Sequence, residues 1–473
     1  MWTSINQALN IIDNFVWGVP LMVLIIAGGL LLTIRLGLLQ IRKLPLALKW
    51  MLQNEEGGKG EISSFSALCT ALSATIGTGN IVGVATAMVS GGPGALFWMV
   101  VAAFLGMATK YSEGLLAVKY RTVAEDGHSL GGPFYYIELG MGKNFKWLAK
   151  IFAFFGVCVG LFGIGTFSQV NGISSAVHGF FDPNDAFTVK ILPFLGEYSW
   201  SVVIASLILS FCVAAVLIGG VKRIASVSQI IVPFMAVIYF VFAVILICCN
   251  ITKVPAAFAT IVTAAFSPKA ITGGAVGSML IAMQKGVARG IFSNEAGLGS
   301  APIAAAAAQT NSPVRQGLVS MTGTFIDTII ICTLTGLSIV LTGAWQVEGL
   351  EGVQVTTYAF QHGLPFPAQF SSFILMLCLV FFAFTTILGW DYYSERCLEY
   401  LSGGNMKHVK IFRWIYILAV FIGPYMTVSA VWTIADIFNG LMAIPNLIAL
   451  LILSGQVKKL AIDVDQAEKS GTL

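Results

Sequence analysis

Apolar runs of about twenty residues recur along the whole of this chain, and they limit its fold more than any other feature. A helix of that length crosses the hydrocarbon core of a bilayer. Only 10% of the 473 residues are charged, whereas a soluble domain has about 25%, so the chain lacks the charge to cover a water-facing surface. We therefore predict an all-α integral membrane protein that contacts lipid and has about 11 transmembrane helices.

The apolar runs and the polar residues between them define these spans. A short amphipathic segment, Ile5 to Phe15, leads into the first span, and the absence of Lys and Arg before Asn14 is unlike a cleavable signal peptide. The last two spans are separated at Gly423–Pro424. The predicted spans lie near residues 17–36, 63–89, 93–118, 147–180, 199–219, 225–250, 271–308, 317–343, 367–400, 410–428 and 430–454.

The basic residues give this arrangement an orientation. With the N-terminus outside, only Lys190, Lys253 and Lys269 fall on the outer side, and all other loop charges follow the positive-inside rule. The C-terminus, with a polar and mobile tail over 455–473, is then cytoplasmic. The basic residues predicted inside are Arg35, Arg42, Lys43, Lys49, Lys119, Arg121, Lys143, Lys146, Lys150, Lys222, Arg223, Arg315, Arg396, Lys407, Lys410, Arg413, Lys458 and Lys459.

Two spans contain glycines and polar residues where a membrane helix should be uniformly apolar. They are Leu72–Ile81 in the second span and Gly286–Ser300 in the seventh. Free backbone groups in lipid cost several kcal/mol each, so such stretches must be enclosed by protein or line a cavity. Because these spans lie five apart, they run in opposite directions, which predicts two inverted five-helix repeats, residues 62–250 and 271–454, after an N-terminal segment 1–61.

The break in the second span suits two kinds of ligand. Free carbonyls around Ser73 to Ile76 suit a small cation, and free N–H groups around Thr78 to Ile81 suit a carboxylate. Such an arrangement is typical of a secondary transporter for an amino acid and a coupling ion. The alternative is that Gly79 and Gly83 only permit close helix packing.

Four motifs give the chain a family resemblance. Thr75–Ala87, Gly91–Met99, Gly290–Pro302 and Gly389–Tyr393 resemble the alanine/glycine:cation symporter family of bacteria and archaea, with Val100 where that family often has Trp. The matches extend in order from about residue 63 to 400. The resemblance implies a LeuT-type 5+5 inverted repeat with one extra N-terminal helix, in a prokaryotic inner membrane. It also implies uptake of alanine or glycine with sodium, or with a proton in some members.

The resemblance also implies site residues. Thr78, Gly79 and Asn80 match the stretch that faces the substrate carboxylate, and Gln169 and Asn171 look like the polar wall of the site. The walls around a small neutral side chain would come from Gly290, Ile291, Thr386 and Trp390. By similarity to LeuT-type transporters, sodium would contact the carbonyls of Ser73 and Ile76 and the hydroxyls of Thr385 and Thr386.

Ionisable residues within spans are further candidates for function. Arg289 and Glu295 are candidates for a gate, or alternatively a structural pair that ties the broken helix to a neighbour. Asp327 can carry a proton or tune ion affinity, or it can be a hydrogen-bonded structural acid. Asp436 is a fourth such residue, in the last span.

Other functions are less well supported. The sequence has no HExxH motif and only four His, which argues against an enzyme. Its eight cysteines show no CxxC or Cys/His cluster, so we expect free thiols and no organic cofactor or nucleic-acid partner. A channel remains an alternative, because broken helices also line channels, and a proton-coupled amino-acid carrier of the same fold is the closer one.

Overall fold

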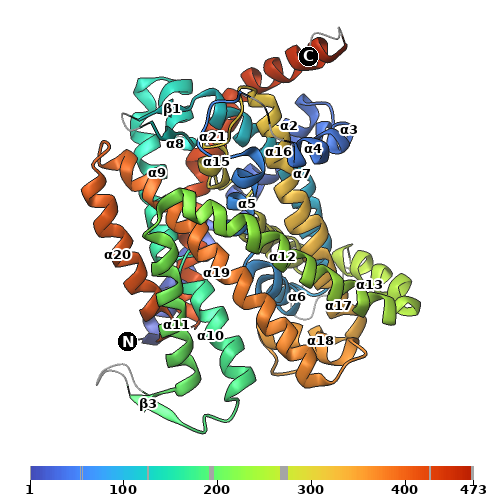
Figure 1. Cartoon of the computed structure of the whole chain (residues 1–473). Coiled ribbons are helices and arrows are strands. Elements are labelled where there is room, and N and C mark those ends of the chain that lie inside the picture. The colour runs from blue at the N-terminus through green and yellow to red at the C-terminus, as the bar shows by residue number, and fades with distance from the viewer. Residues whose placement is uncertain are drawn as a thin grey trace.

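The computed structural model describes residues 2–53, 55, 57–124, 127–190, 197–266, 275–425 and 428–469, which are almost entirely helical (Figure 1). This confirms an all-α membrane protein. Two small antiparallel hairpins lie in loops: β1 (Thr122–Val123) pairs with β2 (Ser129–Leu130), and β3 (Thr188–Lys190) pairs with β4 (Glu197–Ser199).

Eight helical runs of the described chain are long and apolar enough to cross a membrane, and a ninth is formed if one bent pair counts as a single span. The eight are α1–α2 over Asn6–Arg35, α7 (Gly94–Lys119), α9–α10 over Lys143–Phe181, α11 (Trp200–Leu217), α12 (Gly220–Cys249), α16–α17 over Pro313–Thr342, α19 (Ala368–Leu401) and the Thr433–Asp463 part of α21.

Two more helices lie where spans are predicted. They are α14 (Ala275–Asn294), which is more polar than the eight, and α20 (Met406–Ile422), which has 17 residues. The start of the predicted seventh span, before residue 275, lies outside the described residues. The total of eleven spans therefore stays a prediction. The chain does break at Gly423–Pro424, where a 3₁₀ turn separates α20 from α21 (Val428–Lys469).

Several helices are interrupted. The bent pair consists of α5 (Ser64–Thr75), followed by the π-helix η1 (Gly79–Gly83) and α6 (Val84–Gly91), and its two arms meet at 50°. The sequence did not predict two other interruptions. Span 4 is divided into α9 (Lys146–Phe162) and α10 (Phe167–Phe181), and a π-helix, η5 (Phe325–Cys332), separates α16 (Pro313–Thr324) from α17 (Thr333–Thr342).

The loop elements separate to the two ends of the molecule. In Figure 1, α3 (Leu39–Arg42), α4 (Leu44–Leu52), α8 (Pro133–Tyr135) and β1 lie at the upper end with the C-terminus. The elements β3 and α18 (Val353–Gly363) lie at the lower end. This division agrees with the two groups of loops in the predicted topology. The predicted tail after Gly455 continues α21 as helix to Lys469.

The helix α7 lies at the centre of the packing and contacts α14, α16, α2 (Val19–Arg35), the short outer helix α13 (Val254–Phe266) and α15 (Ala301–Ala305). Close contacts between helices depend on small residues. A Cβ at Gly286 would lie 2.2 Å from the Ala95 carbonyl oxygen, and one at Gly389 would lie 2.8 Å from the Ala74 Cβ. These glycines bring α14 onto α7 and α19 onto α5, and thereby place both breaks beside α19 and α7.

Candidate substrate and ion site

The break in the second span begins where α5 ends. Ile76 is extended, and Gly77 follows it with no room for a side chain, because a Cβ there would lie 2.4 Å from Thr386 Oγ1. The Asn80 side chain closes the turn by accepting a hydrogen bond from the Gly77 N–H at 2.9 Å. The next N–H, that of Thr78, donates to Gln169 Oε1 at 3.0 Å.

The Thr78–Gln169 contact bears on the predicted carboxylate site. The amide oxygen of Gln169, on α10, accepts the hydrogen bond from the Thr78 N–H, the group that is expected to face a substrate carboxylate. The Gln169 Nε2 donates to the Ile164 carbonyl at 2.9 Å. The hydroxyl of Thr78 is buried with no hydrogen-bond partner in the described chain. A neutral amide oxygen is the group that an incoming carboxylate oxygen can replace at a helix N-terminus.

The break in the seventh span follows α14 at Asn294. Glu295 has φ +56°, a left-handed conformation uncommon for a residue other than glycine, and Gly297 and Gly299 also have positive φ. The short helix α15 then resumes the span. The Glu295 carboxylate accepts hydrogen bonds from Trp390 Nε1 at 2.7 Å and from Ser300 Oγ at 2.5 Å. These contacts fix the unusual turn against α19.

Asp327, in the π-helix of span 8, joins the two breaks. Its Oδ1 accepts from Asn80 Nδ2 at 2.7 Å, and its Oδ2 accepts from Ser293 Oγ at 2.8 Å and Thr328 Oγ1 at 2.7 Å. All four side chains are fully buried. Asn294 Nδ2 extends the network to Thr328 Oγ1 at 3.0 Å. The Asp327 carboxylate and the hydroxyl oxygens of Ser293 and Thr328 are hard oxygen ligands of the kind that bind a small cation, whereas the Asn80 amide presents its nitrogen.

The predicted sodium ligands are partly together. Thr386 Oγ1 lies 3.3 Å from the Ile76 carbonyl oxygen, so α19 and the end of α5 meet there. The Thr385 hydroxyl instead donates to carbonyls of its own helix and lies 3.6 Å from Met235 Sδ of α12. The Ser73 hydroxyl donates back to the Thr70 carbonyl at 2.7 Å.

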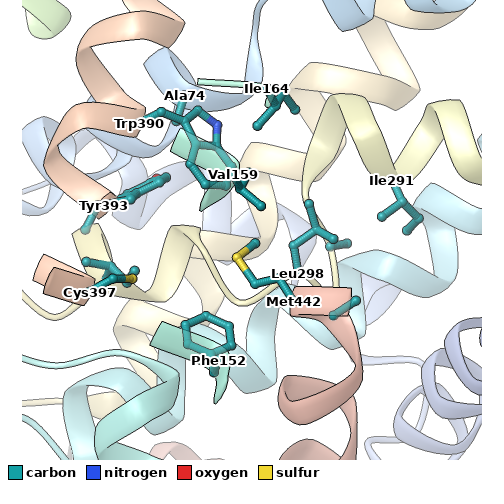
Figure 2. Packing of buried hydrophobic residues seen from close by; sticks show 14 of the residues in the cluster. Ala74, Phe152, Val159, Ile164, Ile291, Leu298, Trp390, Tyr393, Cys397 and Met442 are labelled. Atoms are coloured by element: carbon teal, nitrogen blue, oxygen red, sulfur yellow. The ribbon is translucent and has the colours of Figure 1, made fainter. Parts of the chain in front are cut away.

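The remaining predicted residues lie in different surroundings. Gly290 packs toward Met99 of α7, where a Cβ would lie 3.1 Å from Met99 Cγ. Trp390 is fully buried, and Figure 2 shows it beside Val159, with Ile291 well apart in the view. Asn171 is buried on α10. Among the predicted wall residues, Gln169 and Thr386 form hydrogen bonds to the break in the second span, and Trp390 forms one to the break in the seventh, through Glu295.

Arg289 and Glu295 each contact a different neighbour of the broken helix. Arg289 forms a two-pronged ion pair with Asp436 of α21, at 2.9 and 2.7 Å. Arg289 lies within α14, whereas Glu295 follows the end of that helix in the turn of the break. Arg289 therefore ties α14 to α21, whereas Glu295 ties the break itself to α19.

Other polar groups of this centre were not predicted. Ser293 and Thr328 belong to the Asp327 network, and a serine next to Asn294 in the span 7 motif was the available signal. Glu113 of α7 accepts from the Gly297 N–H at 3.1 Å and from Asn446 Nδ2 at 2.6 Å. A third group is Lys110, whose ammonium is buried without a described hydrogen-bond partner.

Lys110 lines a cavity of about 10 Å³, room for one water, between α5, α7, α15 and α16. Among the described residues, no group of three or more His, Cys, Asp or Glu side chains is placed to hold a metal ion.

The architecture defines a class of protein. A chain with eight or nine membrane-crossing helices, in which two broken helices meet at an enclosed polar centre, is a membrane transporter. The model of the sodium:alanine symporter family matches residues 2–473, and the chain belongs to that family. It is therefore a multi-pass transporter of the sodium-coupled amino-acid class and not an enzyme.

Three relatives illustrate the range of the family. An uncharacterized transporter of Haemophilus influenzae is 55% identical over 95% of this chain and 93% of its own. The sodium/alanine symporter AgcS of Methanococcus maripaludis is 47% identical over 95% of both chains. A Bacillus subtilis protein named a probable sodium/glutamine symporter is 36% identical over 100% of this chain and 93% of its own.

Proposed function

We propose that this protein imports a small neutral amino acid, alanine or glycine, together with sodium by alternating access. The observation that carries the proposal is the junction of the two broken helices. One buried carboxylate, Asp327, accepts hydrogen bonds from both of them. Near this junction, the Thr78 N–H donates to the neutral amide oxygen of Gln169. The Methanococcus relative, named a sodium/alanine symporter, supports alanine as the substrate.

In this proposal the substrate carboxylate binds the N–H groups of Thr78, Gly79 and Asn80 and displaces the Gln169 amide oxygen. Asn171, Gly290, Ile291, Thr386 and Trp390 complete the wall of the site. Two charged groups beside the break in the seventh span already have partners, since Glu295 holds Trp390 and Arg289 holds Asp436. None of them is left to pair with a charged substrate side chain, which favours a neutral one.

Sodium has two candidate positions. One is formed by the carbonyls of Ser73 and Ile76 with the hydroxyls of Thr385 and Thr386, supported by the 3.3 Å approach of Thr386 to Ile76. The other is Asp327, whose full negative charge a cation would neutralise. Asp327 and Glu295 are also buried acids that can carry protons, so proton coupling is the alternative function that the structure supports.

We also propose the LeuT-type arrangement, with eleven spans and repeats over 62–250 and 271–454 after an N-terminal segment 1–61. The basic loops and the C-terminus then lie in the cytoplasm of a prokaryotic cell, and the N-terminus lies outside the inner membrane. Two observations support this: the loops predicted on each side gather at opposite ends of the molecule, and the named relatives are bacterial and archaeal.

The test is uptake of radiolabelled alanine by proteoliposomes with one ion gradient at a time. We expect saturable uptake with an inward sodium gradient and no proton gradient, competed by glycine. Uptake with a proton gradient alone would replace sodium by a proton and transfer the coupling role to Asp327 and Glu295. Linear, non-accumulating flux would indicate a channel. No flux with either gradient, from folded protein, would exclude alanine as the substrate.

A further inference from the structure

The chain leading into α5 and the chain leaving α15 lie side by side at the predicted cytoplasmic end. They form parallel extended backbone with a bridge between Ile62 and Ala308. The Glu61 N–H donates to the Ala307 carbonyl at 2.9 Å, and the Gln309 N–H donates to the Ile62 carbonyl at 2.8 Å. Because α5 and α15 are the half-helices next to the two breaks, this pairing links the broken spans outside the membrane.

One side chain forms hydrogen bonds to both segments. Arg121, two residues beyond α7, donates from Nη1 to the carbonyls of Ala308 at 2.8 Å and Ala306 at 3.3 Å. Its Nη2 donates to the carbonyls of Lys59 at 2.8 Å and Thr310 at 2.5 Å. Only a planar guanidinium offers enough fixed donors to bind four carbonyl acceptors on two segments of the chain at once. We call this arrangement the Arg121 clamp.

Two glycines allow the segments to come this close. A Cβ at Gly60, which has φ +147°, would lie 2.3 Å from the Ala308 carbonyl oxygen, and one at Gly58 would lie 2.7 Å from the Gln309 carbonyl oxygen. Glu55 adds a third tie from the same segment, since it accepts a hydrogen bond from the Thr310 hydroxyl. The pairing is thus built into the backbone and does not depend on Arg121 alone.

The clamp lies near the cavity that Lys110 lines. The cavity that Lys110 lines is bounded by Ala67 in the first turn of α5 and Ala305 in the last turn of α15, a few residues from the paired segments. Separation of α5 from α15 would open this space to the cytoplasm. The acceptors of the clamp are uncharged carbonyls, so water can replace them when the segments part, without leaving a buried carboxylate unpaired.

We propose that Arg121 is the positioning residue that closes the cytoplasmic side of the transporter, and that release of its four carbonyls opens the path for substrate and ion. This inference rests on the proposed alternating-access function. The Arg121 clamp holds the state in which the site is sealed from the cytoplasm. Loss of the clamp therefore shifts the population toward the state open to the cytoplasm.

The test is a thiol introduced into the cavity, Ala71→Cys, and its rate of labelling by a membrane-impermeant reagent from the cytoplasmic side. The same protein with Ala71 gives the background from the native cysteines, including Cys69, which is buried on the same helix. We expect Arg121→Gln and Gly60→Ala each to raise the labelling rate about tenfold or more. Lys59→Ala is the matched control, because it removes a nearby exposed cation and keeps the carbonyl that Arg121 binds.

Transport gives a second measurement. A smaller population of the state closed to the cytoplasm should raise the half-saturation concentration of external alanine about tenfold in the Arg121 and Gly60 variants. If Arg121→Gln does not fold, Arg121→Lys is the alternative variant. It keeps the positive charge but lacks the planar guanidinium, and it should give an intermediate labelling rate. Parental labelling rates in folded Arg121 and Gly60 variants would overturn the inference. Labelling needs no substrate, so absence of alanine uptake in the parent would overturn the proposed function alone.

Discussion

The Asp327→Asn substitution tests the centre of the proposed mechanism. It removes the negative charge that joins the two breaks and keeps nearly the same shape. An asparagine can still accept from Asn80, and the hydroxyls of Ser293 and Thr328 can rotate to accept from the new amide. The hydrogen bonds lose only their charge assistance, about 1 kcal/mol each, so we expect a folded protein with modestly lower thermal stability.

The effect on a bound cation should be larger. Two unit charges 4 Å apart interact by about 4 kcal/mol at an effective dielectric constant of about 20. Relaxation of the neighbouring side chains reduces the net loss to roughly 2–4 kcal/mol, which corresponds to about a 30- to 1,000-fold weaker sodium affinity. We therefore expect Asp327→Asn to raise the sodium half-saturation concentration far more than it lowers the melting temperature.

The assay is alanine uptake by proteoliposomes over a range of external sodium, with melting temperature measured on the same preparations. Thr328→Val is the matched control, because it removes one donor to Asp327 and keeps the charge, so its sodium affinity should fall by less than about tenfold. If Asp327→Asn takes up alanine with parental sodium dependence, then Asp327 does not hold the cation and is a structural acid.

Three other substitutions test the surrounding contacts. Arg289→Gln leaves Asp436 buried without its ion-pair partner and should destabilise the protein by about 3 kcal/mol. In a thermal double-mutant cycle, the further substitution Asp436→Asn should recover part of this lost stability, and additive losses would contradict the pairing. Gln169→Glu places a charged oxygen at the N–H of the span 2 break and should weaken alanine binding at least tenfold, whereas unchanged binding would exclude this carboxylate site. Gly77→Ala directs a Cβ to within 2.4 Å of a threonine hydroxyl of α19 and should cost about 1–3 kcal/mol, whereas Gly179→Ala, which has open space, should not; equal melting temperatures would contradict the tight contact.

The sequence predicted the membrane class and the two breaks because both leave a compositional signal. Apolar runs set the spans, and glycines with polar residues inside a span have no other physical use in lipid than a break or close packing. One glycine serves both a break and close packing. A Cβ at Gly79 would lie 3.0 Å from the Ser293 Cα, so Gly79, which lies in the break, also allows α14 to pack closely against it.

Other interruptions have no such signal. The π-helix η5 contains Asp327 in an otherwise largely apolar stretch, and nothing in its composition distinguishes a wider turn from an α-helix. The division of span 4 between Phe162 and Phe167 contains Gly163 and Gly165, but it lacks the run of polar residues that marks the other two breaks. Both depend on how neighbouring helices pack, which one sequence cannot show.

Long-range partners were equally beyond the sequence. Arg121 was counted as one of many positive charges in cytoplasmic loops, because a charge that orients a membrane protein and a charge that clamps two backbones look the same in sequence. Its acceptors lie 62 to 189 positions away and are backbone carbonyls, to which any residue type could contribute. The partner of Arg289, Asp436, likewise lies 147 positions away, on α21.

The two ties between the broken spans differ in what can loosen them, and this difference bears on coupling. At the membrane centre, Asp327 binds Asn80 and Ser293 through a full negative charge, so a cation that approaches it competes directly with both donors. At the predicted cytoplasmic end, Arg121 binds uncharged carbonyls, which ion binding at a distance affects little. An ion can therefore act on the clamp only by moving α5 or α15, the half-helices that lie along the chain between the two ties. We therefore expect coupling to depend on the rigidity of two short helices, α5 with 12 residues and α15 with 5, and not on direct electrostatics between the two sites.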